Sequence, residues 1–139
     1  MITISRRETF NAAHRLFREE WSDEKNLEIF GKCSNPNWHG HNYILFVTVK
    51  GEPDPVKGYV INMNILKKIV QEKIILKVDH KNLNLDVDFM NGQVATTENL
   101  AVAIWNELSG PVEAAGARLH CIRIEETENN SIEYYGKED

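Results

Sequence analysis

A run of β-branched and aromatic residues lies at His41-Asn-Tyr-Ile-Leu-Phe-Val-Thr-Val-Lys50. It ends at Gly51, and the turn-forming segment Glu52-Pro-Asp-Pro-Val-Lys-Gly58 follows it. Runs of this composition, bounded by glycine and proline, are typical of β-strands. We therefore predict a long strand over residues 41–50, and the other elements can be arranged around it.

Strand patterns also lie on both sides of this run. Residues 2–16 are rich in Ile, Thr and Phe and predict a first strand. The charged segment 17–30 predicts a short surface helix that begins at Ser22. Near the C-terminus, residues 118–126 and 131–135 predict two more strands, joined by a turn at Asn129-Asn130.

Two helices are predicted between the second and third strands. Apolar residues recur at helical spacing from residue 65 to residue 74, and Asn62 or Asn64 can cap this helix. We expect it to end before residue 79. Thr96 or Thr97 can cap the second helix, whose apolar face continues until the Gly-Pro pair at 110–111 ends it.

The resulting order, β-β-α-α-β-β, predicts an α+β fold with a four-stranded antiparallel sheet and both helices on one face. Such a sheet has two edges whose N–H and C=O groups lack partners, and symmetric assembly with further copies can pair them. We therefore expect a homo-oligomer. No repeat, low-complexity tract or linker divides the chain, so residues 1–139 are predicted to form one domain.

The charge balance restricts the partners. The 139 residues contain 16 Lys and Arg against 21 Asp and Glu, a formal net charge of −5 at pH 7. A broad basic face for nucleic acid is therefore not expected.

No apolar run approaches the ~20 residues that cross a bilayer, and the first ten residues lack the apolar stretch of a secretion signal. We expect a soluble, cytoplasmic protein without a membrane partner, in which both cysteines stay reduced.

Three histidines have the spacing of a metal site. In an extended segment residues i and i+2 lie on one face, so His39 and His41 can present their imidazoles side by side. His14, after two small alanines at the end of the first predicted strand, is the natural third ligand. Three neutral imidazoles suit Zn²⁺ and leave one coordination position open, which is the catalytic pattern. The alternative is that His-Gly-His is a chance pair of surface histidines.

Four further residues are candidates for the chemistry. Cys33 lies in a polar loop, where a nearby cation would favour its thiolate and make it a base or nucleophile; alternatively it is a fourth zinc ligand. Asp79 and His80 can form a carboxylate–imidazole pair that transfers protons, or can simply end a helix. Glu126 can bind a guanidine-like edge through two oxygens, or can be a solvated carboxylate.

Five segments of the chain resemble those of the 6-pyruvoyl-tetrahydropterin synthase family. They are Phe10-Asn-Ala-Ala-His14-Arg-Leu16, Gly31-Lys-Cys33-Ser-Asn-Pro-Asn-Trp-His39-Gly-His41-Asn-Tyr43, Asp79-His80-Lys-Asn-Leu83, Thr96-Thr97-Glu98-Asn99 and Glu126-Thr-Glu-Asn-Asn130. The resemblance extends from residue 2 to about residue 136. Several motifs in the family's order are far more specific than any one of them.

The resemblance implies a tunnelling fold, in which trimers close a β-barrel and two trimers stack into a hexamer with active sites between subunits. It implies one Zn²⁺ per subunit on His14, His39 and His41. The implied reaction is that of a carbon–oxygen lyase of tetrahydrobiopterin-type biosynthesis, which converts 7,8-dihydroneopterin triphosphate to 6-pyruvoyl-tetrahydropterin and releases triphosphate. Mg²⁺ is a candidate partner of the substrate's triphosphate.

The resemblance also implies individual roles. Cys33 corresponds to the general base, and Asp79 and His80 correspond to its proton-handling partners. The residues implied to bind the pterin are Glu126, as the anchor of its amino-pyrimidine edge, and Thr96, Thr97 and Glu98, as pocket residues.

Three alternative functions stay open at this point. The first is that of the related 6-carboxytetrahydropterin synthases of queuosine biosynthesis, which usually place the cysteine three residues before His-Gly-His. Here five residues intervene, and Asn35-Pro36-Asn37 is characteristic of the pyruvoyl enzymes, which we therefore favour. Trp38 departs from the glycine that the animal enzymes tend to have, and it could narrow the pocket.

The second alternative function is that of a cysteine hydrolase that uses Cys33, His80 and Asp79. The third is that of a non-catalytic zinc- or pterin-binding protein.

Overall fold

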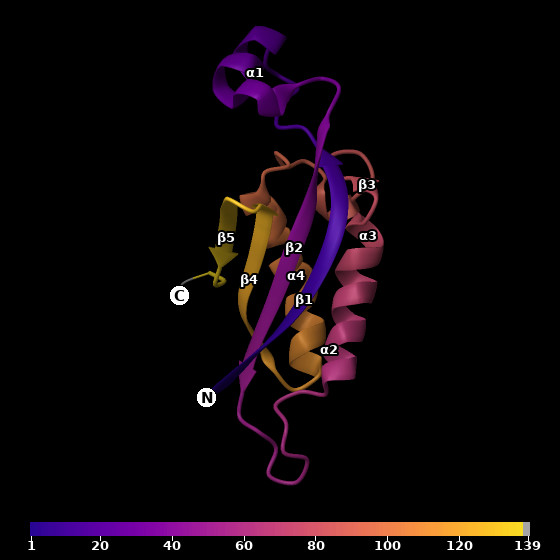
Figure 1. The fold of residues 1–139 in the computed structure, drawn as a ribbon, viewed down its shortest axis with the longest axis vertical. Helices are drawn as coiled ribbons and strands as arrows, with labels where there is room; N and C mark the ends of the chain where they lie inside the picture. Colours follow the sequence, from indigo (N-terminus) through magenta and orange to yellow (C-terminus); the bar gives the residue numbers. More distant parts are fainter. Residues whose placement is uncertain (138–139) are drawn as a thin grey trace.

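One mixed five-stranded sheet organises the fold (Figure 1). The structure, a computed structural model, describes residues 1–137. The strands are β1 (Ile2–His14), β2 (His39–Gly51), β3 (Lys81–Asn82), β4 (Arg118–Thr127) and β5 (Asn130–Tyr134), in the sheet order β3-β1-β2-β4-β5. The predicted strand over 41–50 is confirmed, and it begins two residues earlier, at His39.

The prediction of a purely antiparallel, four-stranded sheet was incomplete. Strands β1, β2, β4 and β5 pair antiparallel, but β3 adds a short parallel pairing in which Ala12 and Ala13 lie opposite Lys81 and Asn82. Two polar residues are too short a strand to produce a periodic pattern in the sequence. The first strand also ends at His14 rather than at residue 16.

The predicted helix after Asn62 is confirmed as one continuous helical segment. It consists of α2 (Met63–Val70), the π-helical turn η2 (Gln71–Ile75) and α3 (Leu76–Val78). The side chain of Asn62 caps it by accepting a hydrogen bond from the backbone N–H of Asn64. Neither this helix nor any other described helix is long and apolar enough to span a membrane.

The last helix, α4 (Thr97–Ala114), is capped by Thr96 but continues past the point where we expected it to end. A proline removes one helical hydrogen bond and normally ends or kinks a helix. Val112 lies directly after Pro111 and is fully buried. Packing of this last turn against the core thus outweighs the local preference, and the prediction of an end at 110–111 was wrong.

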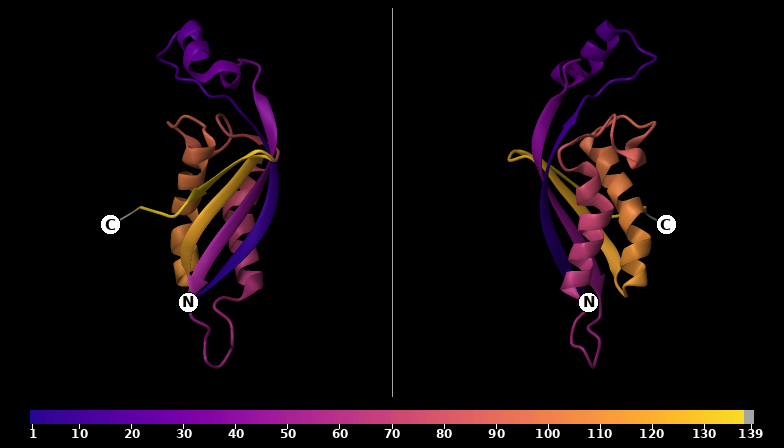
Figure 2. Two further views of the ribbon diagram at one scale, coloured as in Figure 1. Left: turned by 60° about the vertical axis from the view of Figure 1, so that its left-hand side comes forward. Right: turned by 90° about the vertical axis from the view of Figure 1, so that its right-hand side faces the viewer.

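The two long helical segments cover one face of the sheet, as predicted (Figure 2). The core lies between the two layers, and β2 contributes every second residue to it: Tyr43, Leu45, Val47 and Val49 are all buried. The same alternation, followed back toward the start of β2, places His41 and His39 on the helix-covered face. The candidate site therefore continues the core at one end of the sheet.

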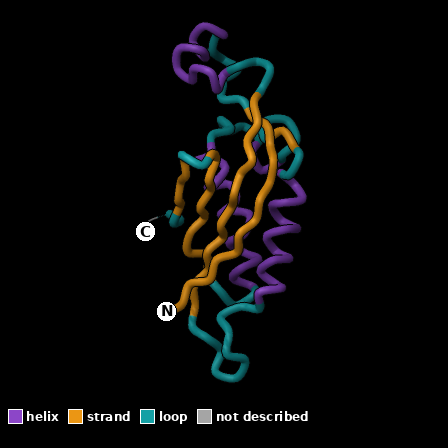
Figure 3. Tube along the Cα trace, in the orientation of Figure 1, coloured by secondary structure: helices purple, strands orange, loops and turns teal. Residues whose placement is uncertain are grey.

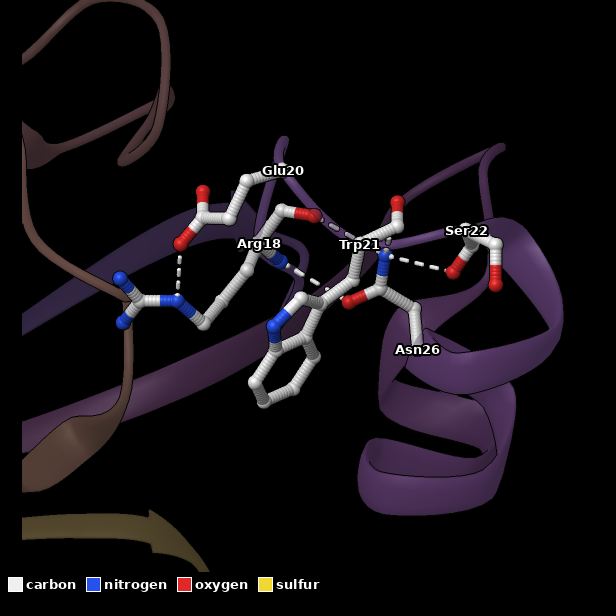
Figure 4. A network of polar contacts seen from close by, with 5 residues as sticks. All are labelled: Arg18, Glu20, Trp21, Ser22 and Asn26. Atoms are coloured by element: carbon white, nitrogen blue, oxygen red, sulfur yellow. Dashed lines mark hydrogen bonds and ion pairs between the residues drawn. The ribbon is translucent and has the colours of Figure 1, made fainter.

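The segment between β1 and β2 extends beyond that end of the sheet (Figures 1 and 3). It holds α1 (Asp23–Phe30), capped by Ser22 as predicted, and the 3₁₀ turn η1 (Gly31–Ser34). The buried Asn26 closes the loop before α1, because its Oδ1 accepts from the N–H of Arg18 and its Nδ2 donates to the carbonyl oxygens of Arg18 and Ser22 (Figure 4). This network fixes the path of the chain toward Cys33. A second 3₁₀ turn, η3 (Asp88–Met90), precedes α4.

Candidate metal centre and adjoining pocket

The strand register brings the three predicted metal ligands together. His14 lies directly opposite His39 in the β1–β2 pairing, and His41 lies two residues further along the same face. One nitrogen from each imidazole lies within 4.8 Å of the others. The ring centroids are 4.5 Å apart for His14 and His39, and 5.1 Å apart for His39 and His41. The convergence predicted from the His-Gly-His spacing is confirmed.

The hydrogen bonding of the three imidazoles leaves one nitrogen of each available to a metal ion. Nδ1 of His14 lies 2.8 Å from the carbonyl oxygen of Ala95 and donates a hydrogen bond to it, which leaves Nε2 with a free lone pair. Nδ1 of His39 and Nε2 of His41 are buried and have no hydrogen-bond partner. Buried polar atoms are normally paired, so these converging, unpaired nitrogens fit a bound cation. Three imidazoles are a donor set for a divalent transition metal.

Burial also favours the neutral form of two of these rings, those of His14 and His39. Burial is the main reason that the pKa of His14 lies below its usual value. Burial likewise lowers the pKa of His39, with a further contribution from the neighbouring His41. Since only the neutral imidazole binds a metal, both shifts prepare the site for metal at neutral pH.

Glu126 borders the three histidines. Its neighbours Ile122 and Ile124 face the core, so the alternation along β4 places Glu126 on the same face. A bulge between Glu125 and Thr127 leaves Glu126 without a direct partner on β5, a device that re-aims side chains next to active sites. Its Oε1 lies 3.5 Å from Nε2 of His41.

Thr97 orients the other oxygen of Glu126. It is the first residue of α4 and is buried, and its hydroxyl donates a hydrogen bond to Oε2 of Glu126. The carboxylate is therefore held between a histidine of the cluster and the N-terminus of a helix.

A pocket of about 270 Å³ opens at this carboxylate. Its lining consists of Leu16, Thr96, Thr97, Glu98, Glu126, Asn130, Ser131 and Ile132. All four residues predicted to bind the substrate thus line a single pocket. Leu16, Ser131 and Ile132 were not predicted as pocket residues, and Asn130 was predicted only as part of a turn. The sequence indicated these additional pocket residues only by their positions, close to residues 14 and 126 at the ends of predicted strands.

Cys33 lies in the 3₁₀ turn η1, half-buried and with a free thiol. The backbone N–H of Leu16 donates to its carbonyl oxygen, which ties the turn to the end of β1. Within residues 1–137, the converging donor atoms come from the three histidines alone, and the Cys33 thiol is not among them. The structure therefore gives no support to Cys33 as a fourth ligand that closes a structural site.

Asp79 and His80 form the pair that the sequence suggested. Oδ1 of Asp79 lies 3.0 Å from Nδ1 of His80 and accepts a hydrogen bond from the backbone N–H of Asn11 at 2.9 Å. The turn that this pairing requires is present, because His80 has a left-handed φ of 59°. The Asn11 N–H, and then His80, lower the pKa of Asp79, so its carboxylate is ionised and orients the exposed imidazole.

The pair lies at the outer edge of β1, whereas Cys33 lies in the segment beyond the end of the sheet (Figure 1). Within the described part of the chain, no hydrogen bond or ion pair joins Cys33 to Asp79 or His80.

Trp38, directly before His39, adopts a left-handed backbone conformation with φ 67°. This region is costly for any residue with a Cβ and favours glycine. The indole packs edge-on against Phe17 at 6.4 Å, and the guanidinium of Arg15 lies 4.1 Å from the centre of the Phe17 ring. This aromatic packing holds the strained residue in place.

We expect Trp38→Gly to be more stable than Trp38→Ala by about 1 kcal/mol, because both variants lose the Phe17 contact but only alanine keeps the left-handed strain. Urea unfolding of the metal-free variants at one protein concentration measures the difference. The same two substitutions at the exposed Lys32, in the 3₁₀ turn, should give the opposite order, by about 0.5–1 kcal/mol. Equal stabilities of the two Trp38 variants would contradict the strain.

The fold and this site together define a class: an α+β protein with a three-histidine candidate metal centre beside a small-molecule pocket. The family model for 6-pyruvoyl tetrahydropterin synthase matches residues 3–137. The 6-pyruvoyl tetrahydrobiopterin synthase of Pongo abelii is 50% identical over 134 residues, which cover 96% of this chain and 91% of that protein. The chain therefore belongs to the 6-pyruvoyl tetrahydropterin synthase family of enzymes.

A solved structure supports the fold. A second relative concerns the alternative that the chain is a 6-carboxytetrahydropterin synthase. The 6-pyruvoyl tetrahydropterin synthase of Caenorhabditis elegans superposes with a TM-score of 0.88 at 41% identity, covering 98% of this chain and 96% of that one. A 6-carboxy-5,6,7,8-tetrahydropterin synthase of Bacillus subtilis is only 29% identical over 100 residues, covering 70% of this chain and 64% of that protein. The carboxy enzymes are thus distant relatives.

Proposed function

We propose that this chain is a zinc-dependent enzyme that converts 7,8-dihydroneopterin triphosphate to 6-pyruvoyl-tetrahydropterin and eliminates triphosphate. The observation that carries the proposal is the contact between the metal centre and the pocket: Oε1 of Glu126 lies 3.5 Å from Nε2 of His41, and Glu126 also lines the pocket. A pterin held by this carboxylate would have its side chain beside the three histidines. The name and the 50% identity of the Pongo abelii relative support the same reaction.

His14, His39 and His41 would hold the zinc, which supplies Lewis acidity toward the hydroxyl oxygens of the substrate's side chain. Glu126 binds the N–H groups of the amino-pyrimidine edge through its two oxygens, and the Thr97 hydroxyl keeps the carboxylate oriented. The remaining pocket residues enclose the ring. The pterin is thereby fixed with its reacting carbon toward the histidine cluster.

Cys33 acts as the base that removes a carbon-bound proton from the side chain. The reaction must also deliver protons, and His80, oriented by the ionised Asp79, is the second proton-handling group. No nicotinamide or flavin is needed, because oxidation of the side chain is balanced by reduction of the ring. Triphosphate leaves with the electrons of the bond that it breaks, and Mg²⁺ bound to it would stabilise the leaving group.

Assembly of several copies would bring the proton-handling groups together. Cys33 and the Asp79–His80 pair lie apart within one chain, so His80 of one copy would serve the Cys33 of another. The outer edge of β1 is paired only near Ala12 and Ala13 within the described residues, which leaves its first half free for another strand. A hexamer of two barrel-forming trimers, with sites between subunits, meets both requirements. The two free cysteines are consistent with a reducing compartment, for which we propose the cytoplasm.

Incubation of the zinc-loaded protein with 7,8-dihydroneopterin triphosphate, with and without Mg²⁺, tests the proposal by mass analysis of the released pterin. We expect a product that keeps the three-carbon diketo side chain, together with free triphosphate. Loss of acetaldehyde would instead identify the 6-carboxytetrahydropterin reaction. Binding of zinc and pterin without any turnover would identify a non-catalytic binding protein.

A further inference from the structure

A buried tyrosine hydroxyl lies beneath the metal centre, and the proposed reaction does not use it. Tyr43 is 0% exposed and follows His41 by two residues on β2, so it lies on the same face of the sheet. Its ring stacks on Phe10, with centroids 4.8 Å apart and an interplanar angle of 12°. The strand and this stacked neighbour leave the ring little freedom.

The hydroxyl points at the imidazole of His14. Its oxygen lies 3.5 Å from Nδ1 and 3.4 Å from Nε2 of His14. The two distances are nearly equal, so the oxygen lies against the imidazole midway between its nitrogens and not in line with the lone pair of Nε2; the two rings are nearly perpendicular, at 81°. Among residues 1–137, the polar contacts of this hydroxyl are with His14 alone.

His14 is therefore held from two directions. The carbonyl oxygen of Ala95 accepts the hydrogen of its Nδ1, and the hydroxyl of Tyr43 supports the ring itself. His39 and His41 differ, because each has a buried nitrogen without a hydrogen-bond partner and both are more exposed than His14, which is 1% exposed. Of the three ligands, His14 is the one whose orientation the protein fixes before a metal arrives.

We propose that Tyr43 is a positioning residue of the metal centre: its hydroxyl holds the His14 ring so that the free nitrogen stays beside those of His39 and His41. The inference rests on the proposed metal site and adds to it a residue that does not itself bind the metal. Loss of such a supporting contact typically weakens metal binding by about 10- to 100-fold.

Tyr43→Phe tests this inference, because phenylalanine keeps the stack on Phe10 and removes a single oxygen atom. We expect the Kd for Zn²⁺, measured by competition with a chromophoric chelator, to rise by about 10-fold or more. In the Co²⁺-substituted protein, the visible absorption bands should change in position or intensity, because a less restrained His14 alters the ligand geometry. Tyr134→Phe is the matched control: Tyr134 packs on Trp105 at the β5 edge of the sheet and should leave both readouts unchanged.

Thermal unfolding of the metal-free variants separates positioning from packing. A Tyr43→Phe variant with a wild-type Kd and a wild-type Co²⁺ spectrum overturns the inference, whether or not its metal-free stability changes. A wild-type protein that binds no zinc would overturn the proposed metal site as well, so the two failures can be told apart.

Discussion

Replacing His39 with alanine is expected to remove zinc from the protein and to abolish turnover. The substitution deletes one of three converging ligands and leaves a two-histidine site, too few for a stable zinc centre. Metal analysis of dialysed protein should fall from about one ion per subunit to a small fraction of that. Since Lewis-acid stabilisation contributes several kcal/mol, kcat/KM should fall by at least about 10³-fold.

His120→Ala provides the matched control. His120 lies on β4, outside the cluster, and packs against Tyr135. This variant should keep its zinc and most of its activity. A His39→Ala protein with a full complement of zinc, or a zinc-free wild type with full activity, would refute the metal centre.

The second large effect is expected for Cys33→Ala, which should lower kcat by about 10²- to 10⁴-fold, the usual contribution of a general base. Zinc content and pterin affinity should stay at wild-type values, because Cys33 lies in its own 3₁₀ turn and belongs to neither the histidine cluster nor the pocket lining. Single-turnover rates, metal analysis and equilibrium binding of a pterin without the triphosphate measure the three quantities.

Cys121→Ala is the control for loss of a thiol. Cys121 is buried in β4, where burial raises the pKa of its thiol and keeps it protonated. Its replacement should leave kcat unchanged. Wild-type turnover of Cys33→Ala would eliminate Cys33 as the base, while the metal site would stand.

The parts of the fold that were predictable are those that depend on local chemistry. Side chains of Ser22, Asn62 and Thr96 cap helices where the sequence indicated, because a cap needs only its own helix. The β2 strand was predictable because its long run of β-branched and aromatic residues, ended by Gly51, is a local signal. The approach of His39 to His41 was predictable because they lie two residues apart on that strand and so share one face.

The two features that the prediction missed, strand β3 and the last turn of α4, depend instead on packing beyond the local sequence. Strand β3 forms because the chain turns at His80 and then pairs with the edge of β1. The two paired segments lie about 70 residues apart in the sequence. Helix α4 continues past Pro111 because Val112 is buried in the hydrophobic core. In neither case does the local sequence contain the partner that decides the outcome.

The sequence by itself thus determined the long strands, the capped starts of the helices and the placement of His39 and His41 on one face of β2, because spacing and capping act over a few residues. Only the tertiary structure decided that Glu126 meets His41, that Thr97 orients Glu126, and that Ala95 and Tyr43 hold His14. Each of those contacts joins residues that lie at least 29 positions apart in the chain. Their geometry follows from strand register and helix packing, which arise only when the whole core is buried at once.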